Sequence, residues 1–391
     1  MASKSVVIIG GGAIGSAVAY WLTAAPGFSG EVVVVERDPT YRQASSALSA
    51  SSIRQQFSTP VNIAIGRFGI EFLRDVGTRL AVAGERPEIG LVEPGYLFLA
   101  TPPGMAVLRA NHEIQRAHGA DVELLTPAEL QRRYSWLAVD DLAGASLGRT
   151  GEGWFDGYGL LRAFRAKALA QGARYLPREA VGLAVDGGAV RAVRLADGES
   201  LACDAVVNAA GPWAARVAAM ADIDLPVRAR ARSVFVLASP AELPGCPLVI
   251  DPSGFWIRTE GRHFITGAPP RPGADRDDLP LEPDHALFEE VIWPALAARI
   301  PAFEQLRVTN AWAGYYEYNT IDQNGIVGPH PQIGNLYFAN GFSGHGIQQA
   351  PAVGRGLAEL ILHGRYRTLD LMPLGFERFG AGRPLIERNV I

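Results

Sequence analysis

A glycine-rich stretch near the N-terminus has the residue types and the spacing of a phosphate-binding turn. The stretch Gly10-Gly11-Gly12-Ala13-Ile14-Gly15 contains the pattern G-x-G-x-x-G. Gly10 permits a tight turn, Gly12 lets a pyrophosphate approach the backbone, and Gly15 allows a helix to pack closely on a strand. The start of that helix offers N–H groups and a partial positive charge. The stretch therefore predicts a dinucleotide site that includes Gly10, Gly12, Ala13, Ile14 and Gly15.

An acidic residue stands where a dinucleotide site needs one. Glu36 follows the next apolar run and can accept hydrogen bonds from ribose hydroxyls. A carboxylate there repels a 2′-phosphate, so we expect FAD or NAD rather than NADP. Arg37 comes next, at the exit of the strand, and is also a candidate cofactor contact. The stretch alone does not distinguish FAD from NAD.

The elements that must position these residues form a βαβ unit. Residues 6–9 and 31–35 are short β-branched apolar runs, typical of buried parallel strands, and residues 16–22 continue an apolar helix between them. The alternative is a glycine-rich turn of some other fold. The two flanking strands and the acid at the end of the second favour the dinucleotide interpretation.

A run of small residues, 44–52, leads into Arg54. It is either a flexible linker or a backbone that lies flat against a large planar ligand, and its low polarity favours the ligand. Ser45 and Ser46 are then cofactor contacts. The Arg54 guanidinium suits a substrate carboxylate, because its fork pairs with both oxygens, although a surface arginine is the alternative.

Two later stretches repeat the pattern of a strand followed by backbone with little bulk. Residues 205–213 end in small residues and a tryptophan, and residues 341–348 form a glycine-rich turn that opens a long helix over 347–363. The dipole of that helix would stabilise negative charge on a cofactor. These stretches add the following candidate cofactor contacts: Ala210, Gly211, Trp213, Gly341, Gly344, Gly346, Ile347 and Gln348.

Hydrophobic patterning places other elements along the chain. We expect helices over 60–76, 103–118, 161–171 and 283–300, and a capping box where Thr126 begins a helix. An aromatic turn is expected over 151–160, and Val227 marks a change to a β pattern. Strands are expected at 89–92, 96–99, 190–195, 200–201, 233–238, 248–251, 255–259, 263–266, 308–316, 325–329 and 336–340.

Composition excludes several classes of function. The 391 residues are 48% hydrophobic and 19% charged, with a net charge of −4, which fits a globular protein and gives no footprint for nucleic acid. Cys203 and Cys246 have no metal-ligand spacing and are expected to be reduced. We expect no metal, no signal peptide and no transmembrane segment. The expected location is the cytoplasm, with peripheral association at the inner membrane as the alternative.

Four stretches in this order resemble the D-amino-acid oxidase superfamily of FAD enzymes, which includes sarcosine oxidases, glycine oxidases and D-amino-acid dehydrogenases. They are 10–15 with Glu36, 45–57, 206–213 and 341–348, and the resemblance covers nearly the whole chain. Residues 52–57, 314–325 and 341–351 resemble most closely the FOXRED-type branch, the FAD-dependent oxidoreductase domain-containing proteins.

The resemblance implies an α/β fold with two domains. A Rossmann-type FAD-binding domain would comprise residues 1–60, 150–225 and 325–391. A discontinuous α+β substrate domain would comprise 61–149 and 226–324, with a mixed or antiparallel sheet over the flavin.

The chain departs from the sarcosine oxidase pattern at three positions. Those enzymes attach flavin through a cysteine just before a T-x-D segment, where this chain has Tyr315 before residues 320–322. We therefore expect non-covalent FAD. Gln348 replaces a lysine of the last helix, and no lysine lies at 263–265, where their oxygen-activating lysine should fall. Both differences favour a dehydrogenase over an oxidase.

The implied reaction is oxidation of the C–N bond of an amino acid or N-substituted amino acid to an imine, which hydrolyses to an oxo acid and an amine. Arg54 matches the carboxylate arginine, and His345 is either a base or part of the pocket wall. Tyr315, Tyr316, Tyr318 and Trp256 form either an aromatic wall around the amine or a packed core. Arg54, His345, Tyr315, Tyr318 and Gln348 make up the candidate catalytic set.

The expected partners are a small amino-acid-type substrate and an electron acceptor that stays open among a quinone, an electron-transfer protein and O2. The alternative function is that of an FAD-bound accessory protein in assembly of a respiratory complex, with little or no turnover. An NAD-dependent dehydrogenase is disfavoured, because the turn at 341–346 has no role in it.

Overall fold

The first structural unit is built on a six-stranded sheet in the order β18-β19-β12-β1-β2-β8. The computed structural model describes residues 4–388. Neighbouring strands are parallel except β18 and β19. The strands are β1 Ser5–Ile9, β2 Glu31–Val35, β8 Arg174–Leu176, β12 Ala205–Asn208, β18 Ile326–Pro329 and β19 Leu336–Asn340.

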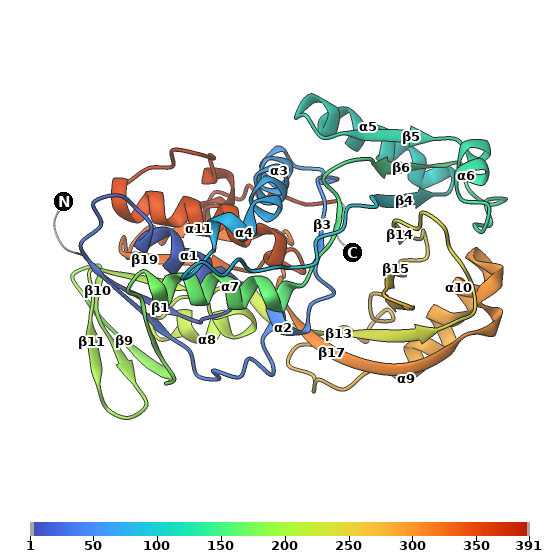
Figure 1. The fold of residues 1–391 in the computed structure, drawn as a ribbon. Coiled ribbons are helices and arrows are strands. Elements are labelled where there is room, and N and C mark those ends of the chain that lie inside the picture. The colour runs from blue at the N-terminus through green and yellow to red at the C-terminus, as the bar shows by residue number, and fades with distance from the viewer. Residues whose placement is uncertain (1–3, 389–391) are drawn as a thin grey trace.

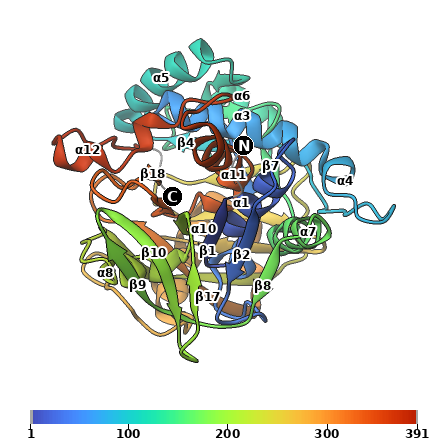
Figure 2. The ribbon, with the colours of Figure 1, turned by 90° about the vertical axis from the view of Figure 1, so that its left-hand side faces the viewer.

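Alternate side chains of β1 face two different layers, as the pleat of a strand requires. Val6 and Ile8 belong to a core formed with the helices, while Val7 and Ile9 belong to a core formed with a three-stranded sheet. Figure 2 shows β9 and β10 on one side of β1 and β2 and α7 on the other. The three-stranded sheet consists of β9 Ala180–Asp186, β10 Ala189–Leu195 and β11 Ser200–Ala202.

Helices cover the other face of the parallel sheet. The bounds are α1 Ala13–Thr23, α3 Pro60–Arg74, α4 Val76–Arg79, α7 Gly157–Ala170 and α11 Gly346–His363. Helix α8, Ala214–Ala219, packs instead in the core on the side of the three-stranded sheet. The apolar side of α1 packs between α7 and α11, and Phe72 of α3 joins the same core. The exact domain boundaries expected from the sequence, at residues 60, 150, 226 and 325, remain a prediction.

The second structural unit is an eight-stranded mixed sheet in the order β17-β13-β16-β15-β14-β4-β6-β5. Every pair in it is antiparallel except β14 with β4. Its strands are β4 Tyr96–Ala100, β5 Val122–Leu125, β6 Gly144–Gly148, β13 Val227–Ala238, β14 Leu248–Ile250, β15 Trp256–Glu260, β16 His263–Gly267 and β17 Arg307–Asn319. The predicted combination of a Rossmann-type sheet with a mixed sheet is confirmed.

Short helices pack on the second sheet and complete the chain. They are α5 Pro102–Ala117, α6 Pro127–Arg133, α9 His285–Leu287, a π-helical segment Phe288–Ile292, α10 Trp293–Arg299 and the 3-10 turn Pro301–Gln305. The remaining elements are the helices α2 Ser45–Leu48 and α12 Glu377–Gly380, the strands β3 Ser52–Ile53 and β7 Gly153–Trp154, and the 3-10 turns Gly211–Trp213 and Met372–Leu374.

Strands β13 and β17 join the two units. They pair from Val227 with Asn319 to Ala238 with Arg307. Val227 lies in the core beside the parallel sheet, whereas Phe235 lies in the core of the second unit. Figure 1 shows both strands running out beneath the second unit, with β4 to β6 above them. One cavity is lined by residues of both units.

Several predicted bounds are wrong, and each has a local reason. Residues 89–92 form no strand: Gly90 has φ +55°, and Val92 makes only a single bridge to Trp154. Helix α7 begins at Gly157 rather than at 161, because Asp156 caps it by accepting from the N–H of Gly159 at 2.8 Å.

Other expected elements survive with changed lengths. The helix expected over 283–300 is interrupted by the π-helical segment, and β17 runs three residues further than expected, to Asn319. The capping box at Thr126 is confirmed, since Thr126 and Glu129 exchange side-chain and backbone hydrogen bonds. The hairpin between β10 and β11 is also confirmed.

Candidate active site

The glycine-rich turn between β1 and α1 is tightly packed. Gly10 has φ +102°, a value that favours glycine, and a Cβ added at Gly15 would lie 1.9 Å from the carbonyl oxygen of Gly10. Gly12 is the N-cap of α1 and offers no side chain there. A cavity of about 460 Å³ opens beside the turn, and we call it the turn cavity. The predicted contacts that line it are Gly10, Gly12, Ala13, Ile14, Glu36, Arg37, Ser45, Ser46, Ala210, Gly211 and Trp213.

Glu36 is fixed at the edge of the turn cavity by backbone donors. Its Oε2 accepts from the N–H of Gly11 at 2.8 Å, and its Oε1 accepts from the N–H of Asp38 at 2.8 Å. Burial raises the pKa of Glu36, and these two hydrogen bonds oppose the rise. Opposite it, the guanidinium of Arg37 lies 3.9 Å above the ring of Trp213, so both side chains form a wall of the cavity.

The short helix α2 joins the turn cavity to a second one. Ser46 Oγ accepts from the N–H of Ala13 at 3.1 Å, and Ser45 Oγ donates to the carbonyl oxygen of Tyr315 at 2.6 Å. Both serines line both cavities. The small residues of 44–52 therefore lie along two adjoining cavities, which agrees with the ligand interpretation of that run.

The second cavity, about 130 Å³, lies between the start of α11 and the mixed sheet, and we call it the inner cavity. Gly344, Gly346, Ile347 and Gln348 line it, and no side chain caps the first turn of α11. A Cβ added at Gly344 would lie 2.5 Å from the Tyr316 ring. Gly341, at φ +73°, does not line the cavity and shapes the turn instead.

Arg54 lies at the wall of the inner cavity and is 1% exposed. Its Nη1 donates to the carbonyl oxygen of Gln56 at 2.7 Å, and its Nη2 lies 2.9 Å from His345 Nε2. The guanidinium also lies 4.3 Å from the centre of the Phe57 ring. Burial lowers the pKa of Arg54, and Tyr96, Glu387 and Glu152 oppose that shift by their charges. The cation is thus rigidly held.

His345 is a buried neutral partner of this arginine. Burial lowers its pKa well below the ordinary value, the charge of Arg54 lowers it further, and a hydrogen bond to the backbone of Phe342 opposes both. A neutral imidazole accepts at Nε2 from the guanidinium. Gln348 holds the same arginine from its backbone side, since Gln348 Oε1 accepts from the N–H of Arg54 at 2.9 Å.

The predicted tyrosines lie in two different places. Tyr315 lines the inner cavity and donates its hydroxyl to the carbonyl oxygen of Leu279 at 2.6 Å. Tyr318 lies further along β17, with Arg230 5.3 Å from its ring centre, and is not among the lining residues. The structure therefore brings together Arg54, His345, Gln348 and Tyr315, and leaves Tyr318 apart.

Sequence reasoning left several buried polar residues outside the candidate set. Glu317 lines both cavities, and burial raises its pKa to about 8, although N–H groups of Gly341 and Phe342 donate to it. Burial likewise raises the pKa of Glu152 to about 7. Arg232 and Tyr96 also line the inner cavity. The only sequence signal was the position of Glu317 inside the stretch 314–325 that carries the family resemblance.

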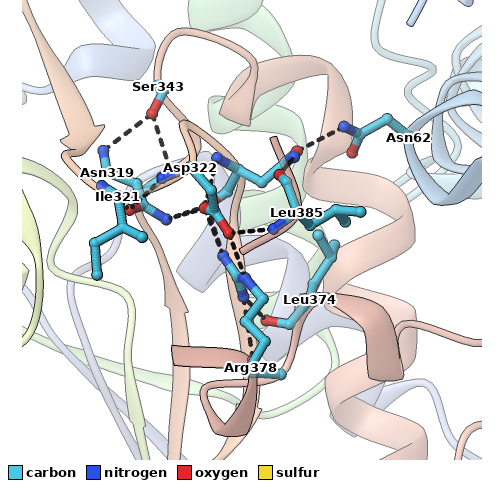
Figure 3. Close-up of polar contacts among 11 residues, drawn as sticks. Asn62, Asn319, Ile321, Asp322, Ser343, Leu374, Arg378 and Leu385 are labelled. Carbon is cyan, nitrogen blue, oxygen red and sulfur yellow. Dashed lines mark hydrogen bonds and ion pairs between the residues drawn. The ribbon is translucent and has the colours of Figure 1, made fainter. Parts of the chain in front are cut away.

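A network of polar side chains holds the turn after β17 (Figure 3), and Glu387 binds the loop after Arg54. Asp322 is buried and binds Arg378 through two hydrogen bonds, of 2.7 and 3.0 Å. The N–H of Leu385 also donates to Asp322, at 2.9 Å. Glu387 accepts from the N–H of Ser58 at 2.7 Å. The C-terminal segment thus ties these two loops together.

The residues of the two cavities fit a flavin dinucleotide. The turn offers backbone N–H groups and a glycine without bulk for a pyrophosphate, and Glu36 stands beside it for a ribose. The adjoining inner cavity, past Ser45 and Ser46, reaches the uncapped start of α11. The cysteines Cys203 and Cys246 line neither cavity.

Two other predictions concern absences. Across residues 4–388, no group of three or more His, Cys, Asp or Glu could hold a metal ion. Within the same residues, no helix has the length and apolar character needed to cross a membrane.

Comparison with known proteins places the chain among flavin enzymes. A family model described as FAD dependent oxidoreductase (DAO) matches residues 5–360. The FAD-dependent oxidoreductase domain-containing protein 1 of Xenopus laevis is 44% identical over 99% of this chain and 84% of its own length. Mouse mitochondrial sarcosine dehydrogenase is 27% identical over 96% of this chain and 41% of its own length. The structure of L-proline dehydrogenase from P. horikoshii superposes with a TM-score of 0.86, at 28% identity, covering 98% of this chain and 99% of that one.

Proposed function

The chain belongs to the DAO family of FAD-dependent oxidoreductases, and on that premise we propose that it oxidises the C–N bond of an amino acid or N-substituted amino acid. The substrate carbon loses a hydride and the nitrogen a proton, which leaves an imine. Water then adds to the imine and releases an oxo acid and an amine. FAD, when bound, supplies the two-electron acceptor for the hydride.

The buried guanidinium of Arg54 at the wall of the inner cavity is the observation that carries this proposal. A buried cation at the wall of a cavity favours an anionic ligand group. A carboxylate on Arg54 would fix the substrate by charge-assisted hydrogen bonds. Such an anchor orients the carbon beside the amine toward the turn cavity.

His345 and Gln348 act on Arg54 rather than on the substrate amine. The imidazole accepts from Nη2 of the guanidinium, and the amide oxygen of Gln348 accepts from the backbone N–H of Arg54, so both the side chain and the backbone of Arg54 are held. A buried imidazole that is neutral and already accepts a hydrogen bond is a poor base. The amine proton is therefore lost to solvent before the hydride leaves.

The start of α11 supplies the positive pole that the reaction needs. Gly346, Ile347 and Gln348 line the inner cavity in the uncapped first turn of an 18-residue helix. The N–H groups and the dipole of that turn stabilise negative charge that develops on the cofactor during reduction. Attachment of FAD is non-covalent in this proposal, because Tyr315 stands at the position of the flavin-linked cysteine of sarcosine oxidases.

The acceptor in this proposal is a quinone or an electron-transfer protein rather than O2. The sequence has two lysines, Lys4 and Lys167, and neither lines a cavity. The nitrogen atoms of both donate to backbone carbonyls elsewhere, at Ile361 and Ala81. The cavity thus has no lysine cation to promote transfer to oxygen.

An anaerobic screen tests the proposal. Purified protein is mixed with D-, L- and N-alkyl amino acids without oxygen, and the yellow absorbance of the flavin is followed. At least one class should bleach it, and re-oxidation should be faster with a quinone or dye than with O2. If none bleaches it, the enzymatic proposal fails. An FAD-bound accessory role without turnover would then be favoured, and co-purification with respiratory subunits would test it.

A further inference from the structure

A second arginine lines the inner cavity. Arg232 lies on β13, and its side chain is 14% exposed. Its neighbour on the same strand, Arg230, does not line the cavity. The ring of Tyr316 lies 5.1 Å from the Arg232 guanidinium. Burial raises the pKa of Tyr316, and the charges of Arg232 and Arg54 both oppose the rise. Tyr316 therefore lies close to two cations.

The inner cavity carries an excess of positive charge. Its charged lining side chains, among residues 4–388, are Arg54, Arg232 and Glu317. The raised pKa of Glu317, about 8, leaves that carboxyl mostly protonated at neutral pH, and His345 is neutral. One substrate carboxylate would balance one guanidinium. The second guanidinium pairs with a carboxylate that does not line the cavity.

In the structure, the carboxylate of an aspartate from an adjacent segment is hydrogen-bonded to the Arg232 guanidinium. Asp275 accepts from Nη1 and Nη2 of Arg232 at 2.8 and 3.2 Å, which is the two-pronged geometry of a carboxylate ligand. Asp275 belongs to residues 271–279, which we call the clamp segment. Arg230 also contacts it, with Asp275 at 2.9 Å and Asp277 at 2.6 Å. The Asp275 side chain is 30% exposed, so it can leave for solvent.

The clamp segment is fastened beside the cavity by other bonds. The N–H of Asp278 donates to the carbonyl oxygen of Ala229 at 2.9 Å, and the hydroxyl of Tyr315 donates to that of Leu279 at 2.6 Å. The bond between Arg230 and Asp277 does not involve Asp275. The segment can therefore stay in place while one carboxylate exchanges for another on Arg232.

We propose that Arg232 forms a second anion subsite of the inner cavity, which takes a second carboxylate of the substrate in exchange for Asp275. The substrate class is then an amino acid with an acidic side chain or with a carboxyalkyl group on nitrogen. This inference rests on the proposed function, since it places the first carboxylate on Arg54. The two anions would lie on either side of Tyr316.

Binding of unreactive acids tests the subsite without turnover. The holoenzyme is titrated with glutarate and with pentanoate, which have the same chain length but two carboxylates and one, and the change in the visible flavin spectrum is followed. Glutarate should bind about tenfold more tightly or better. Arg232→Gln should abolish that preference and leave pentanoate binding unchanged, whereas Arg230→Gln should keep it. Equal binding of the two acids by the wild type, or binding of neither, would overturn the subsite.

Two aspartate variants give a matched test in the opposite direction. Asp275→Asn removes the internal competitor and should tighten glutarate binding severalfold, while Asp277→Asn loosens the same segment without touching Arg232 and should not. If both aspartate variants change glutarate binding equally, the segment acts only by its packing and the exchange is refuted.

The two proposals fail in different ways. If no amino acid reduces the flavin but the glutarate preference depends on Arg232, the catalytic proposal fails and the anion subsite stands. If amino acids with one carboxylate reduce the flavin as readily as those with two, and Arg232→Gln slows neither, the subsite fails and the catalytic proposal stands.

Discussion

Nη2 of Arg54 lies 2.9 Å from Nε2 of His345, and the imidazole accepts this hydrogen bond in its neutral form. The pair comes from residues 291 positions apart in the chain, one beyond the small-residue run and the other at the N-cap of α11. The glycine turn at 341–346 thus has a second role beside its proposed approach to the cofactor. It also carries the residue that orients the candidate substrate arginine.

A positioning role for His345 predicts how its variants behave. His345→Leu should raise the apparent KM roughly 10- to 150-fold, because a lost hydrogen bond to a charged group costs about 1.5–3 kcal/mol, with a smaller change in the limiting rate of flavin reduction. His345→Gln, which can still accept from Arg54, should restore most of the loss. The pH profile of flavin reduction should show no limb between pH 5.5 and 7.5 that belongs to His345. A wild-type limb there that vanishes in His345→Gln would identify a base instead.

Glu317 predicts a pH dependence of stability. Its pKa rises from 4.5 to about 8 on folding, so between these values the folded state binds more protons than the unfolded state. The stability that this group contributes is full below about pH 4.5 and is lost as pH rises through about 8. Glu317→Gln should flatten the decline of unfolding free energy over that window by roughly 3–5 kcal/mol. The exposed Glu289→Gln should leave the decline unchanged, and denaturant unfolding across pH 5–8 measures both. An unaltered slope in Glu317→Gln would mean that its pKa is not raised.

Substitutions at Gly15 and Gly12 should affect folding and cofactor binding separately. A Cβ at Gly15 would meet the Gly10 carbonyl at 1.9 Å, so Gly15→Ala should disrupt the β1–α1 contact and lower Tm strongly. A Cβ at Gly12 meets only Ser46 Oγ, at 3.1 Å, and the residue has an ordinary φ of −63°. Gly12→Ala should therefore fold without FAD and bind FAD at least about tenfold more weakly. Fluorescence titration with FAD and thermal unfolding measure the two effects. Normal FAD affinity in Gly12→Ala would place the pyrophosphate elsewhere.

The C-terminal segment should matter more to stability than its place in the chain suggests. Asp322 has a side chain that is 0% exposed and pairs with Arg378, so Asp322→Asn should cost about 3–5 kcal/mol of unfolding free energy. Glu387→Gln should cost about 1–3 kcal/mol, through weakened acceptors for Ser58, Thr59 and Asn62. The exposed pair of Arg174 and Glu31 is the control, and Glu31→Gln should change stability by less than about 1 kcal/mol. Equal effects at buried and exposed sites would contradict the network in Figure 3.

Local patterns predicted the parts of the fold whose signals are local. The β1–α1–β2 unit, the capping box at Thr126 and the turn before α11 each depend on residues close together in the chain. The order of the mixed sheet could not be predicted, because β14 pairs with β4, some 150 residues earlier. The interruption of the helix at 288–292 by a π-helical segment has no simple sequence signature either.

The site could be predicted only where glycines or a family motif marked it. Arg54 was predicted because it follows a run of small residues, but its contact with His345 arises from tertiary packing. Arg232 looked like any other arginine on an alternating strand. Its place in the inner cavity depends on the register of β13 against β17, in which Arg232 pairs with Gly314. Tyr318 was included with Tyr315 because both are aromatic residues of one segment. The path of β17 in the folded chain places Tyr315 at the inner cavity and Tyr318 outside its lining.

The most direct measurement of the central claim is anaerobic reduction of the flavin in wild-type protein and in Arg54→Ala, by an N-methyl amino acid and by the same amine without its carboxylate. The amino acid should reduce the wild type at much lower concentration than the amine does. Arg54→Ala should keep its FAD but need roughly 30- to 1000-fold more amino acid, since an unpaired charge-assisted contact costs about 2–4 kcal/mol. Reduction of Arg54→Ala at wild-type concentrations of amino acid, or of the wild type equally by both compounds, would contradict the account.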